Sequence, residues 1–175
     1  MKLQNKAFSL KNRPVGLTVF ENKIYAVLQG EYDNLIAVVD LTSNEVIKQI
    51  RTPGEERLTP VIAAGNLLYV GAYASEYYND FLASITPETT VLDFEKSTLT
   101  GSFAQLTDIN SADNKILLAA QDKENRIIVT DPKTKRPSLI PVAGMPIAMT
   151  ILGDKLYIAL EDTDTVLVYD FYYGA

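Results

Sequence analysis

One pattern occurs four times along the chain, at intervals of 40 to 48 residues. Each copy has an apolar stretch, a short turn rich in Asn, Asp and Gly, and a second apolar stretch. Because these turn residues tolerate a positive φ, each turn is expected to join two adjacent antiparallel strands. The second stretches open with the dipeptides Ile24-Tyr25, Leu68-Tyr69, Ile116-Leu117 and Leu156-Tyr157. A repeat of this length made of short strands predicts an all-β repeat architecture.

A third strand is expected in each repeat, ending at Asp40, Asp93, Asp131 and Asp170. Polar turns follow the first three of these residues, and their Asp, Ser and Thr side chains are expected to bond to the turn backbone. A fourth strand is expected at 46–50, 99–103 and 138–142. Prolines at 137 and 141 flank the last of these strands, which is typical of an edge strand.

Four short strands per repeat predict a β-propeller with four four-stranded blades in the chain. We expect one domain, residues 1–175, with repeats at about 14–57, 58–105, 106–145 and 146–175 plus 5–10. The last repeat has no fourth strand of its own after Asp170. The segment 5–10 resembles the fourth strand of the third repeat, so it is expected to supply that missing outer strand.

Three ways of closing the ring are compatible with this arrangement. Either the N-terminal strand closes a four-bladed ring within one chain, or it is exchanged between two chains to give an eight-bladed ring, or the chain is part of a longer protein. The exchanged homodimer is favoured, because a four-bladed ring needs a narrower axis than the small inner residues indicate. Closure hides a sheet edge that would otherwise recruit further chains.

The repeats resemble the YVTN or YncE-like β-propeller repeat family. The closest matches are Leu68-Tyr69-Val70, the segment 34–40, and Met145-Pro146, whereas Leu106 and Leu117 depart from the family pattern. The resemblance covers almost the whole chain and implies a propeller fold. It also implies an extracytoplasmic setting, at the cell surface or in the periplasm, although no signal peptide is recognised in this sequence.

Charge and composition exclude several classes of function. The chain has 16 basic and 22 acidic residues, a formal net charge of −6, and neither histidine nor cysteine. This balance disfavours nucleic acid and anionic membranes as partners. No apolar run is long enough for a membrane helix, so insertion in a membrane is not expected. The absence of His and Cys removes Ser-His-Asp catalysis, thiolate nucleophiles and most catalytic zinc sites, so we expect a protein that is not an enzyme.

Candidate binding residues lie in loops that share one face of a propeller. The second repeat is longer than the others, and its extra residues are expected to form an exposed loop with aromatic side chains suited to recognition. The candidates of this face are Tyr32, Tyr73, Glu76, Tyr77, Tyr78 and Asp80. In the alternative interpretation, Phe81, Leu82 and Ile85 pack over the blade and the tyrosines cap them.

Two arginines and a tyrosine series have their own interpretations. Arg51 and Arg57, in the linker between the first two repeats, are positioned to clamp a carboxylate or phosphate, or else belong to a solvated turn. The residues Tyr25, Tyr69 and Tyr157 recur at the repeat period and are expected to pack between blades.

Three functions follow from these features. The first is a non-enzymatic propeller without a cofactor that binds a protein or small polar ligand on an acidic, tyrosine-rich face, or scaffolds an assembly. The second is a calcium-dependent hydrolase similar to propeller lactonases, with Asp108 as the candidate metal ligand because it opens an inner strand. The third is a structural repeat module of a larger surface assembly.

Overall fold

The chain forms fourteen strands and no helix in the part that the structure describes. The computed structural model describes residues 12–30, 34–52, 57–74, 79–92, 105–112, 114–121, 124–131, 134 and 136–170, with backbone alone at 73–74, 79–81 and 105. The strands are β1 (Arg13–Phe20), β2 (Lys23–Gln29), β3 (Leu35–Asp40), β4 (Val46–Arg51), β5 (Arg57–Ala64), β6 (Leu67–Ala74), β7 (Asn79–Ile85), β8 (Gln105–Ala112), β9 (Lys115–Gln121), β10 (Arg126–Thr130), β11 (Pro137–Pro141), β12 (Pro146–Leu152), β13 (Lys155–Leu160) and β14 (Thr165–Asp170). No helix in the described ranges is long and apolar enough to cross a membrane.

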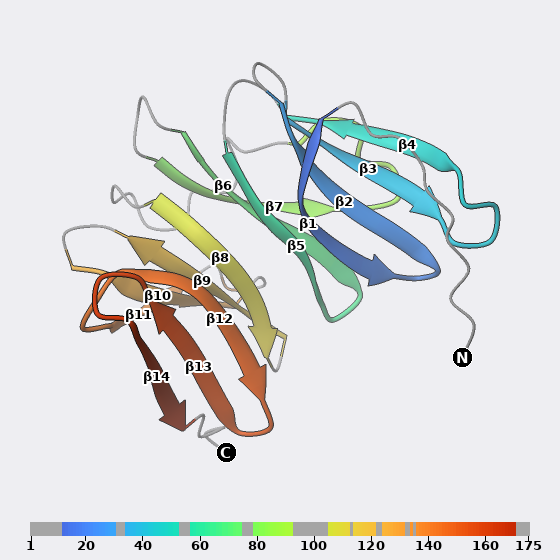
Figure 1. The fold of residues 1–175 in the computed structure, drawn as a ribbon. Helices are drawn as coiled ribbons and strands as arrows, with labels where there is room; N and C mark the ends of the chain where they lie inside the picture. The colour runs from blue at the N-terminus through green and yellow to red at the C-terminus, as the bar shows by residue number, and fades with distance from the viewer. Residues whose placement is uncertain are drawn as a thin grey trace, which may run out of the picture.

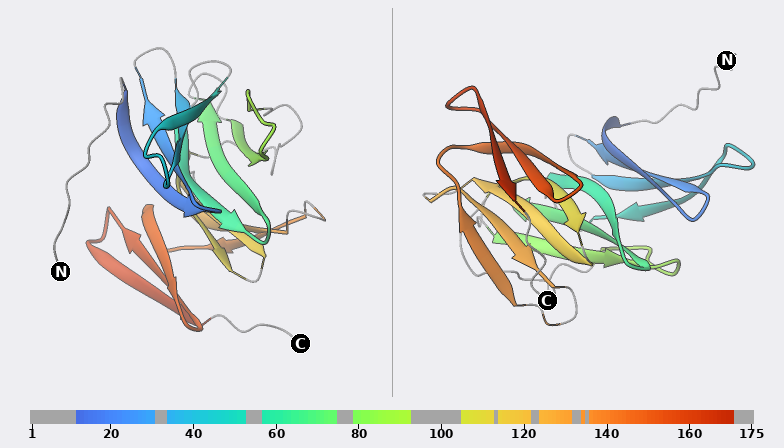
Figure 2. Two further views of the ribbon diagram at one scale, coloured as in Figure 1. Left: turned by 90° about the vertical axis from the view of Figure 1, so that its right-hand side faces the viewer. Right: turned by 90° about the horizontal axis from the view of Figure 1, so that it is seen from below.

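The strands form four separate antiparallel sheets, one for each predicted repeat. Two sheets have four strands, in the orders β1-β2-β3-β4 and β8-β9-β10-β11, and two have three, in the orders β5-β6-β7 and β12-β13-β14. The inner strands β1, β5, β8 and β12 lie side by side along one row (Figure 1, Figure 2). The four predicted blades are therefore confirmed, whereas the strands predicted at 99–103 and 5–10 lie outside the described residues.

The predicted turns form as the residue types require. Glu21 and Asn22 in the turn between β1 and β2 have φ of 46° and 59°, and Gly153 between β12 and β13 has φ of 62°. Asp40 ends β3, and its Oδ1 accepts hydrogen bonds from the backbone N–H groups of Thr42 at 2.8 Å and Ser43 at 2.9 Å. These backbone donors lower the pKa of the Asp40 carboxyl below its ordinary value.

The second repeat departs from the predicted strand order. Its third strand is β7, and the segment after it runs to the preceding blade, where Val91 forms an isolated bridge to Arg51. The predicted third strand ending at Asp93 is therefore wrong. Leu82, Ala83 and Ile85 supply the buried apolar residues that a third strand needs, so the third strand forms at β7. The extra residues of this repeat therefore come after β7.

Each inner strand carries the same irregularity near its start. The pairing with the neighbouring strand shifts between Pro14 and Gly16 in β1, and the same shift occurs at the equivalent places in β5, β8 and β12. Extra residues at such β-bulges turn their side chains away from the regular pleat. The four repeats therefore share one β-bulge, near the start of the inner strand of each blade.

The blades stack through alternate residues of these strands. Val61 of β5 packs in a cluster with Tyr25 of the first blade, and Ile109 of β8 packs with Tyr69 of the second. Both tyrosines are buried, so their predicted role in packing between blades is confirmed, and burial raises the pKa of each phenol above its ordinary value. In the last blade, by contrast, Tyr157 is half-buried.

Side chains of the inner strands also bond to the backbone of the neighbouring blade. The Thr18 hydroxyl donates to the Val61 carbonyl, and Asn110 Nδ2 donates to the Met149 carbonyl at 3.3 Å. The backbones approach closely there, since a Cβ added to Gly16 would lie 2.9 Å from the Cβ of Pro60. Apolar packing thus joins the blades at all three boundaries, and this hydrogen bond recurs at the first and the third.

Candidate functional site

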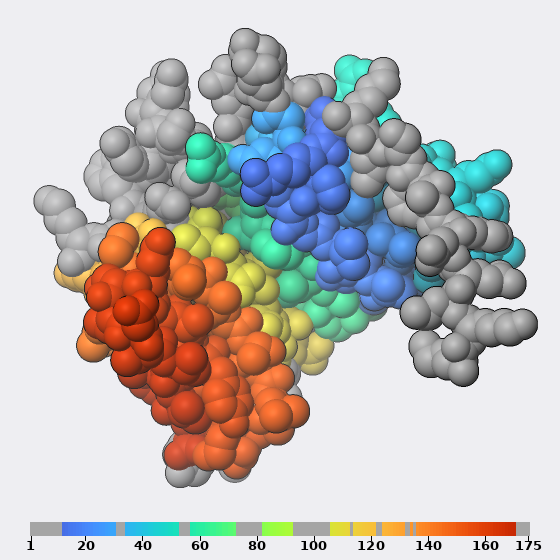
Figure 3. Space-filling model, in the orientation of Figure 1, coloured from blue at the N-terminus to red at the C-terminus, as the bar shows by residue number. Residues whose placement is uncertain are grey.

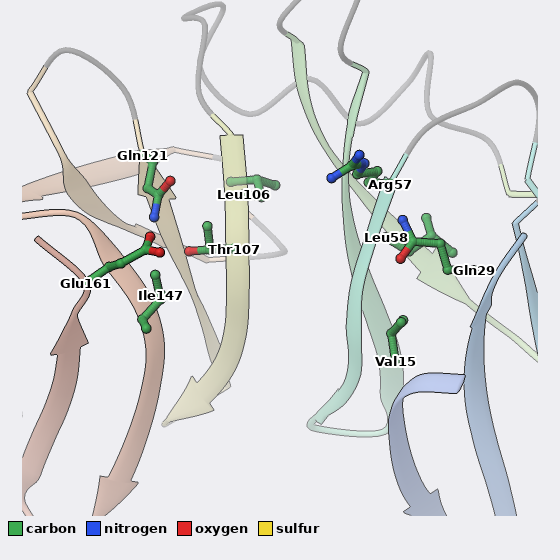
Figure 4. A pocket seen from close by; sticks show the side chains of 9 residues that line it. All are labelled: Val15, Gln29, Arg57, Leu58, Leu106, Thr107, Gln121, Ile147 and Glu161. Carbon is green, nitrogen blue, oxygen red and sulfur yellow. The ribbon is translucent and has the colours of Figure 1, made fainter. Parts of the chain in front are cut away.

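A pocket of about 300 Å³ lies among the starts of the four inner strands (Figure 4). Each blade contributes to its wall, so segments distant in sequence meet there. The pocket lies where second strands end and inner strands begin, which is the side of the propeller expected to carry the candidate binding loops. This pocket is the candidate functional site.

The bulges of the inner strands supply part of the wall. Val15, Thr107 and Ile147 each lie within the bulge of their strand, and all three line the pocket. Leu58 and Leu106, which directly precede the bulges in β5 and β8, complete the apolar lining. The repeated kink therefore shapes the site, since it aims side chains toward the axis.

The polar wall comes from strand ends. Gln29, Gln121 and Glu161 hold the same repeat position, at or directly after the end of the second strand of their blades. Arg57, the first residue of β5, lies on the opposite wall from Gln121 and Glu161 (Figure 4). A guanidinium and a carboxylate therefore face the same space from different blades.

Two of the polar side chains are held in place by one carbonyl. Thr107 Oγ1 donates to the Pro146 carbonyl at 2.7 Å, and Gln121 Nε2 donates to the same oxygen at 3.1 Å. These bonds tie the third blade to the fourth at the wall of the pocket. A wall fixed in this way loses little conformational entropy when a ligand binds.

The structure separates the two predicted arginines. Arg57 lines the pocket, whereas Arg51 ends the outer strand β4 and does not line it. The Arg51 backbone instead joins the first two blades at the rim, donating to the Thr90 carbonyl at 3.0 Å and accepting from the Leu92 N–H at 2.9 Å. Arg51 lies on the outer strand of the first blade and Arg57 on the inner strand of the second, which explains their separation.

The predicted aromatic loop is shorter than expected. Tyr73 lies in β6 and pairs in register with Asp80 in β7, so both are strand residues. Tyr32, Glu76, Tyr77 and Tyr78 lie outside the described residues. Tyr73 nevertheless holds the repeat position of Gln29 and Gln121, one residue before the end of the second strand of its blade.

Asp108 lies between blades and does not line the pocket. Its Oδ1 accepts the N–H of Ile109 at 2.8 Å, and its Oδ2 accepts the N–H of Met149 in the last blade at 2.7 Å. Burial raises the pKa of this carboxyl, partly offset by the two backbone donors. Across the described ranges, no group of three or more acidic side chains is placed to hold a metal ion.

The sequence contains a signal for the pocket residues that the predictions above do not include. Gln29 and Gln121 recur at one repeat position, and Glu161 holds that position in the last blade. Polar residues that recur at the end of the second strand of several blades indicate a surface near the propeller axis to which these blades contribute together. The bulge residues carry no comparable signal, because Val15, Thr107 and Ile147 read as ordinary strand residues.

Comparison with known proteins identifies the fold. No protein-family model and no curated protein sequence matches the chain. Hydrazine synthase of Kuenenia stuttgartiensis is similar in structure, with a TM-score of 0.70 at 18% identity over 90% of this chain and 53% of that one. The WD40 domain of Toxoplasma gondii coronin gives a TM-score of 0.64 at 12% identity over 89% and 42%. WD40 domains are radial arrays of four-stranded blades.

The fold is that of a β-propeller. A further propeller-like neighbour is a complex of KlAtg21 with the coiled coil of AgAtg16, with a TM-score of 0.63 at 12% identity over 94% of this chain and 54% of that one. The chain thus spans about half the length of these structures. At such identities the likeness establishes the fold alone.

Proposed function

We propose that this β-propeller is a non-enzymatic binding or scaffolding protein that recognises a small polar ligand, or a polar segment of a protein, in the axial pocket. The observation that carries the proposal is the placement of Arg57 and Glu161 on opposite walls of one pocket. A ligand with separated positive and negative groups, such as a free amino acid or a dipeptide, matches those charges.

The chemistry of the pocket supports binding over catalysis. Glu161 is the single carboxylate among the nine lining residues, and Gln29, Thr107 and Gln121 are neutral hydrogen-bonding groups. General acid–base catalysis commonly relies on paired titratable groups whose pKa values differ. Neutral groups around one cation and one anion suit recognition of a polar ligand.

The remaining parts of the proposal concern setting and partners. We propose membership of the YVTN or YncE-like repeat group, with the extracytoplasmic location that it implies, on the matches at 34–40 and Leu68-Tyr69-Val70. The similar structure that contains a coiled coil supports a protein as a partner class. A homodimer is part of the same proposal.

Titration calorimetry with free amino acids and dipeptides tests the ligand class. Arg57→Ala is expected to weaken binding of a ligand found with the unmodified chain by about tenfold or more, since charge-assisted hydrogen bonds contribute about 1.5–3 kcal/mol. Arg51→Ala is the matched control, because this exposed arginine lies outside the pocket. Equal loss in both variants, or no binding to any probe, would remove the pocket from the proposal.

The predicted aromatic segment is tested separately. If it contributes to recognition, changing Tyr77 and Tyr78 together to Ala lowers the affinity for a peptide ligand found in that screen by about tenfold, because exposed tyrosines supply contact area at low entropic cost. The measurement is the same calorimetric titration. Unchanged affinity would restrict recognition to the axial pocket.

A further inference from the structure

The first blade presents an apolar surface that every later blade buries. At the equivalent position of the inner strand, Val61, Ile109 and Met149 are at most 7% exposed because the preceding blade covers them. Leu17 holds this position in β1 and is 65% exposed, and Val19, two residues further along, is 61% exposed. Leu17 and Val19 therefore mark a surface built to receive a preceding blade.

The last blade exposes the face that, in the earlier blades, packs on the following blade. Ile36 in β3 and Ile127 in β10 are fully buried in clusters shared with the following blade. The equivalent residue in β14 is Val166, which is 61% exposed, and Val168 is exposed beside it. Leu152 at the end of β12 is 72% exposed. These residues mark a surface built to receive a following blade.

The positions of the two surfaces match their order in the fold. The first blade (blue) and the last blade (orange to red) lie at opposite ends of the row, with the middle blades between them (Figure 1, Figure 3). On the first blade, Ala26, Leu28 and Ala37 already form a small buried cluster, so the exposed apolar area is carried by β1. Exposed apolar patches of this kind mark interaction sites.

A hydrogen bond repeated between blades defines the expected register. Thr18 donates to the carbonyl of Val61, and Asn110 donates to the carbonyl of Met149, so the same inner-strand position donates across two different boundaries. Thr150 holds this position in the last blade and is exposed. In the first blade, the carbonyl of Leu17 holds the position of the Val61 and Met149 carbonyls that accept these bonds.

We infer that two copies of this chain join head to tail, with the last blade of each copy packed on the first blade of the other. In this arrangement, Thr150 of one copy donates to the Leu17 carbonyl of its partner, and Val166 and Val168 cover β1. A second copy fits both surfaces at once, since it carries both halves of the contact. A heterologous contact that closes after two copies leaves neither surface open and gives a ring of eight blades.

Light scattering coupled to size exclusion tests this arrangement on the whole chain. The unmodified protein is expected to have twice the 19.3 kDa mass of one chain. Leu17→Asp and Val168→Asp, each tested alone, are expected to weaken association by about 100-fold or more, because each places an unpaired charge in an apolar contact. Both residues are exposed within one chain, so far-ultraviolet circular dichroism is expected to show folded variants.

Ile47→Asp is the matched control, since Ile47 is an exposed apolar residue of the outer strand β4 and lies on neither surface. This variant is expected to keep the mass of two chains. Loss of the dimer in only one of the two test variants would indicate contact between identical patches and overturn the head-to-tail arrangement. A mass of one chain for the unmodified protein, or polydisperse filaments, would overturn the closed pair.

Discussion

Replacing Ile127 by alanine is expected to lower the free energy of unfolding by about 2–5 kcal/mol. Ile127 is fully buried in the cluster that joins the third and fourth blades, where it packs with Leu156 and Ile158. The truncation removes apolar contacts and leaves a cavity at a boundary between two sheets that share no strand. Urea unfolding monitored by circular dichroism measures the change.

The control for this prediction is Ile47→Ala, the same truncation at an exposed residue of β4. A surface change of this type is expected to alter stability by no more than about 0.5 kcal/mol. Equal losses in the two variants would contradict the account, because they would mean that contacts between blades contribute no more than an exposed side chain does.

Replacing Asp108 by alanine is expected to destabilise the fold by about 1–3 kcal/mol. The carboxylate accepts the N–H of Met149 from the neighbouring blade and the N–H of Ile109 from its own strand. Removing it leaves two backbone donors without this acceptor. Asp108→Asn is the matched variant, since it keeps one acceptor oxygen and is expected to lose less.

The same residue predicts a dependence on pH. Burial raises the pKa of Asp108 in the folded chain above the ordinary value that it has when unfolded. The part of its contribution to stability that comes from the raised pKa is therefore full below the ordinary pKa and is lost as pH rises through the raised one. The difference in unfolding free energy between the unmodified protein and Asp108→Ala is expected to shrink over that window. A difference that grows with pH would contradict burial as the dominant cause.

The sequence predicts the blades well because the repeat combines several local signals. Turn residues such as Asn22 and Gly153, the strand-ending Asp40 and the buried tyrosines each indicate the same boundaries. The third strand of the second repeat was predicted to end at Asp93 because Asp ends this strand in the other repeats. The strand forms earlier in the chain, where Leu82 to Ile85 provide the buried apolar residues. The Asp motif therefore indicated the wrong segment, because the burial of apolar residues determines which segment forms the strand.

The site could be predicted only in part. Arg57 was identified from its place in a linker, whereas its distance from Arg51 depends on which edge of a blade each strand occupies. Gln29, Gln121 and Glu161 were missed although they share a repeat position. The bulges that shape the apolar wall depend on strand pairing, which a single sequence does not reveal.

A disulfide between β1 of the first blade and β12 of the last blade tests most directly whether the exposed surfaces of these two blades pack against each other in a pair of chains. The chain contains no cysteine, so Leu17→Cys with Thr150→Cys introduces the only two thiols. After oxidation, intact mass spectrometry under non-reducing conditions is expected to show a covalent pair of chains, because Thr150 of one copy lies against Leu17 of the other. A disulfide within a single chain, or two free thiols, would contradict the head-to-tail pair.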